Sequence, residues 1–268
     1  MRLRKSLLIA RKDLKEALAG RATLISLILT SVMMVAVSVI VPVSMSIGPD
    51  PGSYMTEEEL ETFRTMFPEA RWMGERQMLA YFMSSVVTPF IFMISSLAAT
   101  SILTADSFAG EKERKTIEAL LAAPISDSEL FLGKVLASFL PALASLYASF
   151  GLACLLIDLL TADLFGYAWF PPPRTALIVC LLTPAYMFLG MCLVVLGSAR
   201  ASTVKDASNY AAILLLPLLA FFLGQVFSGL VLGMAHLALA TVVLVALDVA
   251  FIRLARRAFD REKLVIAS

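Results

Sequence analysis

The chain alternates between long apolar stretches and shorter polar ones. Six stretches of roughly twenty residues carry almost no charge, which is the length needed to cross the ~30 Å hydrocarbon core of a membrane as a helix. We place these spans at residues 22–47, 79–105, 130–157, 175–196, 210–227 and 234–252. The pattern predicts an all-α membrane protein with six transmembrane helices.

Composition and charge agree with this prediction and orient the chain. Of the 268 residues, 59% are hydrophobic and 16% are charged, well below the roughly 25% charged residues of soluble domains. With both termini cytoplasmic, 18 of the 22 basic residues lie on the inner side: seven before the first span, three between spans two and three, Lys134 in the first turns of span three, two between spans four and five, and five after span six. Short external loops avoid Lys and Arg. We therefore expect a multi-pass protein of the plasma (inner) membrane.

The segment before the first span, residues 1–21, has its own pattern. Five leucines recur there at helical spacing, with basic residues between them: Leu3, Leu7, Leu8, Leu14 and Leu18. Such a helix suits the inner membrane surface, with leucines in the lipid and cations at the headgroups. The alternative is a basic tail that only sets orientation. Residues 22–257 then form the transmembrane domain and 258–268 a cytoplasmic tail.

The external loop at residues 48–76 is the longest polar segment on that side. Thr56 stands three residues before Glu59, which is the spacing of a capping box that opens a helix. Leu60, Phe63 and Phe67 share one side of that helix. About thirty residues are too few for an independent core, so we expect a lid or collar over the spans.

A second polar segment, residues 106–129, is rich in charge. Good helix formers run from Gly110 to Leu121, with an apolar stripe among the charged residues, and Ser126 with Glu129 forms a capping box before span three. A helix of this kind, held along the membrane face, could dock in a groove of a soluble partner. It could equally anchor the ends of two spans. The residues alone favour neither reading.

This segment resembles the hallmark of type 2 ATP-binding-cassette (ABC) permeases. That family shows an acidic-basic cluster, a Thr-Leu-Glu motif, a Leu-Leu pair, Pro-Ile/Val-Ser and a Gly-Lys pair, which this chain matches at residues 111–121, 124–126 and 133–134. Ile117 and Lys115 stand where Leu and Gly are commoner. A second similarity lies at residues 198–217, where Thr203-Val204-Lys205-Asp206-Ala207 leads into a proline-bearing fifth span. The resemblance covers nearly the whole chain.

The resemblance implies the permease subunit of an ATP-driven exporter. Two separate ATPase subunits would hold ATP and magnesium, and a second copy of the chain or a related permease would complete the pathway. Membrane lipids are further partners, and nucleic acid is not. The coupling helix would present Glu111, Lys112, Glu113, Arg114, Thr116, Ile117, Glu118 and Leu121 to the ATPase. A second, smaller contact would use Thr203, Lys205 and Asp206.

The chain shows no ATPase motif of its own. Gly133-Lys134 is not a phosphate loop, because Ser128 stands where its first glycine must be and Val135 replaces the Ser or Thr. With one histidine and three cysteines, the sequence also shows no metal or cofactor site, and we expect no enzyme activity. Two alternatives are an intramembrane lipid-modifying enzyme, which needs convergent catalytic groups, and an ion-coupled secondary transporter, which needs charged relays at mid-membrane.

Some polar residues inside the spans are candidates for a substrate path. Ser84, Thr88 and Ser95 fall on one face of span two, and Gln225 lies near the outer end of span five. The other reading is helix–helix packing through small hydroxyl residues. The mostly uncharged spans favour an amphipathic or lipid-like cargo over a bare ion.

Overall fold

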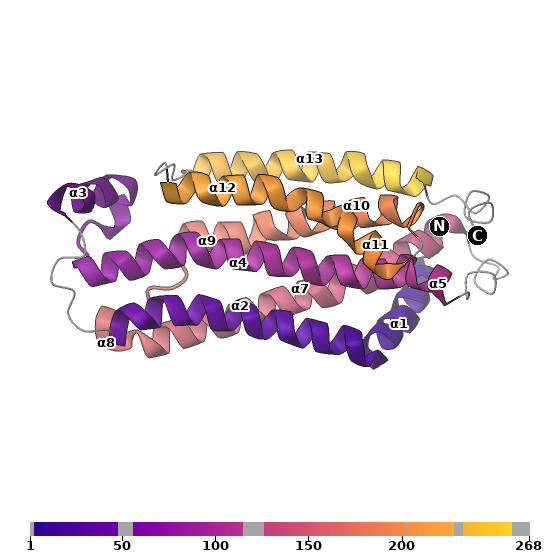
Figure 1. Ribbon diagram of the computed structural model, residues 1–268, viewed down its shortest axis with the longest axis horizontal. Helices are drawn as coiled ribbons and strands as arrows, with labels where there is room; N and C mark the ends of the chain where they lie inside the picture. Colours follow the sequence, from indigo (N-terminus) through magenta and orange to yellow (C-terminus); the bar gives the residue numbers. More distant parts are fainter. Residues whose placement is uncertain (1–2, 48–55, 115–125, 202, 228–232, 259–268) are drawn as a thin grey trace.

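The computed structural model describes residues 3–47, 56–114, 126–201, 203–227 and 233–258 (Figure 1). All regular structure within these ranges is helical. Six helical segments are long and apolar enough to cross a membrane. The predicted all-α architecture with six spans is therefore confirmed, and the chain is a multi-pass membrane protein.

The spans run a few residues beyond their predicted ends. They are α2 (Arg21–Ile47), α4 (Glu75–Phe108), α7 (Asp127–Leu160), the continuous α9, η2 and α10 (Pro173–Leu177, Ile178–Leu182 and Thr183–Ser198), the continuous α11, η3 and α12 (Val204–Asn209, Tyr210–Leu214 and Leu215–Phe227), and α13 (Met234–Ala258). Capping hydrogen bonds define the first residues of two spans, α4 and α7. The Gly74 N–H donates to Gln77 Oε1 at 2.9 Å before α4. Ser126 and Glu129 form the predicted capping box before α7, with both bonds 3.3 Å long.

Helix α4 lies at the centre of the bundle. It contacts α2, α7, α10, α11 and α12, and its side chains are mostly buried, as are those of the α9–α10 span. By contrast, α2 and α13 lie at opposite edges (Figure 1) and expose rows of large apolar side chains. Those rows suit contact with lipid tails, in which an apolar surface is not penalised.

The two ends of the bundle differ in what covers them (Figure 1). At one end, which we call the basic end, lie α1 (Leu3–Ala19), α5 (Gly110–Glu113), α11 and the C-terminal turns of α13. At the other, the aromatic end, lie α3 (Glu57–Met66), η1 (Pro68–Ala70) and α8 (Ala162–Phe165). Helices thus form where the sequence predicts an N-terminal helix and a helix in the external loop. Their roles at the membrane stay predictions.

Aromatic rings pack the segment of α3 and η1 against helix α4. Phe63 meets Phe82 edge to face with ring centroids 4.7 Å apart, and Phe67 meets Tyr81 in the same way at 5.7 Å. This geometry is favourable for aromatic pairs beyond the area that they bury. These rings pack α3 and the residue after it on the first turns of α4, and the role of this segment as a lid or collar stays a prediction.

Candidate coupling site

The predicted coupling helix begins just after α4 ends. Helix α5 covers its first residues, including Lys112, and a turn follows at Arg114. The remaining coupling residues lie outside the described part of the chain: Thr116, Ile117, Glu118 and Leu121. The apolar stripe and the full length of this helix therefore stay predictions.

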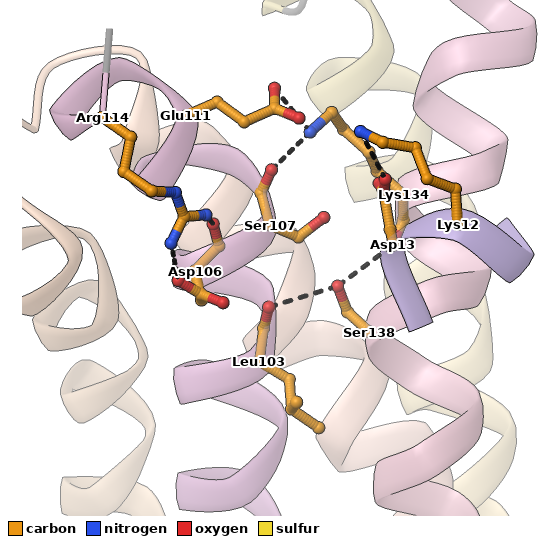
Figure 2. A network of polar contacts seen from close by, with 9 residues as sticks. All are labelled: Lys12, Asp13, Leu103, Asp106, Ser107, Glu111, Arg114, Lys134 and Ser138. Carbon is orange, nitrogen blue, oxygen red and sulfur yellow. Dashed lines mark hydrogen bonds and ion pairs between the residues drawn. The ribbon is translucent and has the colours of Figure 1, made fainter. Parts of the chain in front are cut away.

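A buried lysine of α7 holds the start of the coupling helix (Figure 2). Lys134 Nζ lies 2.8 Å from Glu111 Oε2, and the two side chains are 1% and 13% exposed. A charge removed from water is costly unless an opposite charge and hydrogen bonds compensate it. The pair therefore favours one arrangement of α5 against α7.

The same lysine caps the end of α4. Its ammonium donates to the main-chain oxygen of Ser107 and lies 5.5 Å from the centre of the Phe108 ring. The last carbonyls of a helix lack intrahelical partners and carry the negative end of the helix dipole. Lys134 therefore joins three helices, α4, α5 and α7, through one charged group.

A second ion pair lies nearby but closer to solvent. Arg114 Nη1 is 3.0 Å from Asp106 Oδ1, with the arginine side chain 56% exposed and the aspartate side chain 25% exposed. Pairs in contact with water typically contribute about 0–1 kcal/mol. This pair runs from the start of the coupling helix back to α4, and it does not reach α7 (Figure 2).

The two predicted ATPase contacts meet in the structure. Glu113 Oε2 accepts a hydrogen bond of 3.0 Å from the N–H of Val204, the first residue of α11. That N–H has no partner within its own helix. Thr203 caps the same turn by accepting 3.1 Å from the Asp206 N–H, while Lys205 and Asp206 are exposed. One hydrogen bond thus joins the start of the predicted coupling helix to the start of α11.

Helix α1 packs on α7 beside the lysine. A Cβ atom at Gly133 would lie 2.7 Å from Ile9 Cβ and 3.0 Å from the Ser6 carbonyl oxygen, so a larger residue there would force the helices apart.

A buried acid of α1 lies near the same site. Asp13 is buried, and its Oδ1 atom lies 3.7 Å from Lys12 Nζ. A cavity of about 30 Å³ is lined from α1, α4, α7 and the coupling helix by Asp13, Asp106, Ser107, Glu111, Arg114, Ala137 and Ser138.

The residues predicted for a substrate path are largely buried. Ser84 is 0% exposed and Thr88 1%, whereas Ser95 is half-buried. A cavity of about 220 Å³ lies elsewhere, between α4 and the α11–α12 span, lined by Ile94, Leu97, Ala98, Ser101, Ile102, Ser208, Asn209, Ala211, Ala212 and Leu215. That lining does not include the three hydroxyl residues, so their role in a path stays a prediction.

Gln225 has a basic partner that the sequence did not reveal. Arg174 Nη2 donates to Gln225 Oε1 at 2.5 Å, and both residues are 5% exposed. The guanidinium also lies 5.8 Å from the centre of the Phe67 ring. An arginine at the start of an apolar run was the available signal, but its partner lies 51 residues away.

Comparisons with known proteins agree with the resemblance. A family model described as an ABC-2 family transporter protein matches residues 7–248. The ABC transporter permease protein NatB of Bacillus subtilis (strain 168) is 32% identical over 149 residues, which are 52% of this chain and 37% of NatB. The match therefore spans little more than a third of that relative's length.

Proposed function

The chain belongs to the ABC-2 family of ABC transporter permeases, and from that premise we propose that it exports a substrate by coupling to separate ATPase subunits. One observation carries the proposal. The bond from the Val204 N–H to Glu113 unites, at one end of the bundle, the two segments to which the family resemblance assigns ATPase contact. A soluble subunit would then bind the two joined segments together and not two separate loops.

The distribution of charge supports placing the basic end in the cytoplasm. In this orientation 18 of the 22 basic residues lie inside, as expected when short external segments avoid Lys and Arg. In this proposal both termini lie in the cytoplasm, and the chain lies in the plasma (inner) membrane. ATP-hydrolysing partners would reach the coupling face from that side.

The exposure of α1 supports its assignment to the inner membrane surface. Ser6 and Ala10 are buried, whereas Leu7 and Leu8 are 59% and 61% exposed. Arg11 is exposed on the next turn. Exposed leucines beside cations suit the boundary between lipid tails and headgroups.

In the proposed cycle, ATP and magnesium bind in two ATPase subunits, and this chain forms the pathway with a second copy of itself or with a related permease. Closure of the ATPases moves the two coupling helices and, with them, the spans. An amphipathic or lipid-like cargo suits the low charge of the spans. The conformational change uses the differential affinity of the ATPases for the two states of the permease.

Reconstitution with the ATPase subunit that co-purifies from the native host tests this proposal. We expect ATPase activity that requires the permease and is lost on Glu118→Lys, because the reversed charge would lie in the proposed docking face. Glu61→Lys is the matched control, since Glu61 is an exposed acid of α3 at the aromatic end. ATPase activity that is the same with and without the permease would contradict the proposal.

A further inference from the structure

Building on the proposed function, we propose that Lys134 is a positioning residue that latches the coupling helix to α7 and so carries ATPase movement into the membrane. The latch is the buried contact of Lys134 with Glu111 and the Ser107 carbonyl (Figure 2). The Lys134 side chain is only 1% exposed, which leaves it no surface for direct contact with a soluble ATPase. It acts through the groups that it holds in place.

Burial distinguishes this contact from other charged contacts in the site. The Lys134 side chain is 1% exposed, compared with 56% for Arg114 in the neighbouring pair. Counter-ions screen exposed pairs but have little access to buried ones. The latch therefore resists separation while the coupling helix is displaced, whereas the Arg114–Asp106 pair can exchange with water.

The position of Lys134 connects the latch to the rest of the bundle. The preceding residue, Gly133, lies against Ile9 and the Ser6 carbonyl of α1. One turn further along α7, Ser138 Oγ donates to the Lys134 carbonyl at 3.0 Å. A displacement of the coupling helix that pulls on Lys134 is therefore delivered to the first turns of α7 and, through Gly133, to α1.

The side chain of Glu111 also contacts the permease itself. It points toward Lys134 of α7 (Figure 2), and it is only 13% exposed. The Glu113 carboxylate accepts a hydrogen bond from the Val204 N–H of α11. The acidic residues at the start of the coupling helix thus attach it to the permease, which leaves contact with the ATPase to the residues that follow and to the second segment.

The test follows the nucleotide-dependent movement by hydrogen–deuterium exchange of the complete permease–ATPase complex in lipid nanodiscs. Exchange is compared between the nucleotide-free complex and the complex trapped with ATP and vanadate. In the wild type we expect trapping to change exchange in the coupling helix and in residues 128–138 of α7. In Lys134→Met we expect the change to stay in the coupling helix.

A double variant separates latching from folding. Lys134→Met alone leaves the Glu111 carboxylate without its cation, so the protein could fail to fold. Glu111→Gln combined with Lys134→Met removes both charges, and we expect it to assemble with the ATPase while the response in residues 128–138 is lost. Lys134→Arg keeps the cation, and we expect it to show the wild-type change in exchange of residues 128–138. Asp106→Asn breaks the exposed ion pair, and we expect it to retain that change as well.

Each result has a defined meaning. A wild-type response in residues 128–138 of the double variant would overturn the latch, as would equal loss of that response in Asp106→Asn. Failure of Lys134→Arg to restore the response would overturn it too. If trapping changes nothing in the coupling helix of the wild type, the proposed function itself fails, and the latch fails with it.

Discussion

The basic and aromatic ends of the bundle are held together by different kinds of contact. At the basic end, charge joins the helices, and the buried pair of Lys134 and Glu111 is 2.8 Å apart. At the aromatic end, Trp169 stacks on Phe165 with ring centroids 4.2 Å apart, and its indole N–H donates to Thr161 Oγ1 at 2.8 Å. A buried ion pair thus distinguishes the basic end and stacked rings distinguish the aromatic end, where the buried Arg174 also donates to Gln225.

This difference indicates how the two ends respond to force. Packed rings lose their contacts as soon as they separate, because dispersion attraction is short-ranged. A charged pair keeps part of its attraction over a longer distance, and a lysine side chain can follow its partner. We infer that the aromatic end is a fixed cap and that the basic end is the part built to move.

The largest effect is expected for Lys134→Met. Removal of one partner of a buried ion pair typically costs about 3–5 kcal/mol, and we expect about 4 kcal/mol of stability to be lost here. Denaturant unfolding in detergent measures the loss. The double variant with Glu111→Gln should recover most of it. Equal instability of the single and double variants would show that charge compensation is not what matters at this site.

Trp169→Ala tests the aromatic end. The side chain is 8% exposed and both stacks and donates a hydrogen bond, so truncation leaves a cavity and should cost about 3 kcal/mol. Trp72→Ala is the matched control, because Trp72 is 94% exposed. In contrast to Lys134→Met, Trp169→Ala should leave the nucleotide response of α7 intact. A lost response would mean that the aromatic end is not a fixed cap.

Gly133→Ala tests the approach of α1 to α7. The new Cβ would lie 2.7 Å from Ile9 Cβ, and overpacking of this kind costs about 1–3 kcal/mol. Gly151→Ala, in the same helix, is the control, because nothing lies within 4 Å of a Cβ built there. Thermal unfolding should show a lower Tm for Gly133→Ala and no decrease for Gly151→Ala. Equal Tm values would argue against the close helix contact.

The smallest effect is expected for Glu113→Gln. Its bond to Val204 is exposed, and the neutral amide still offers an oxygen, so we expect a loss of about 1 kcal/mol or less. The specific measurement is hydrogen exchange at the Val204 amide, which should become faster in the variant. Asp106→Asn should leave that amide unchanged. If the Val204 amide exchanged at the same rate in Glu113→Gln, the hydrogen bond between the coupling helix and α11 would be contradicted.

The sequence was sufficient to predict the spans because burial in lipid demands long uncharged helices. The capping box at Ser126 and Glu129 was equally visible, since it depends on residues three apart. Most predicted spans were shorter than the helices that the structure shows. Helix α4 begins at Glu75, four residues before its expected start, because the cap at Gly74 lies outside the apolar run.

The contacts of the candidate site could not be predicted in the same way. Helical spacing shows which residues share a face, but it does not show which face of another helix they meet. Glu113 and Val204 are 91 residues apart in sequence. For Lys134, the family resemblance indicated the Gly-Lys pair at residues 133–134, and the basic-residue count placed the residue on the inner side. Neither observation identified Glu111 as its partner.

Site-specific photo-crosslinking tests the central claim most directly, because it asks where an ATPase touches the permease. A photoreactive residue is placed singly at Ile117, at Lys205 and, at the opposite end, at Trp72. We expect crosslinks to the ATPase subunit from positions 117 and 205 and none from position 72. A crosslink from position 72, or an intact complex with no crosslink from positions 117 and 205, would contradict it.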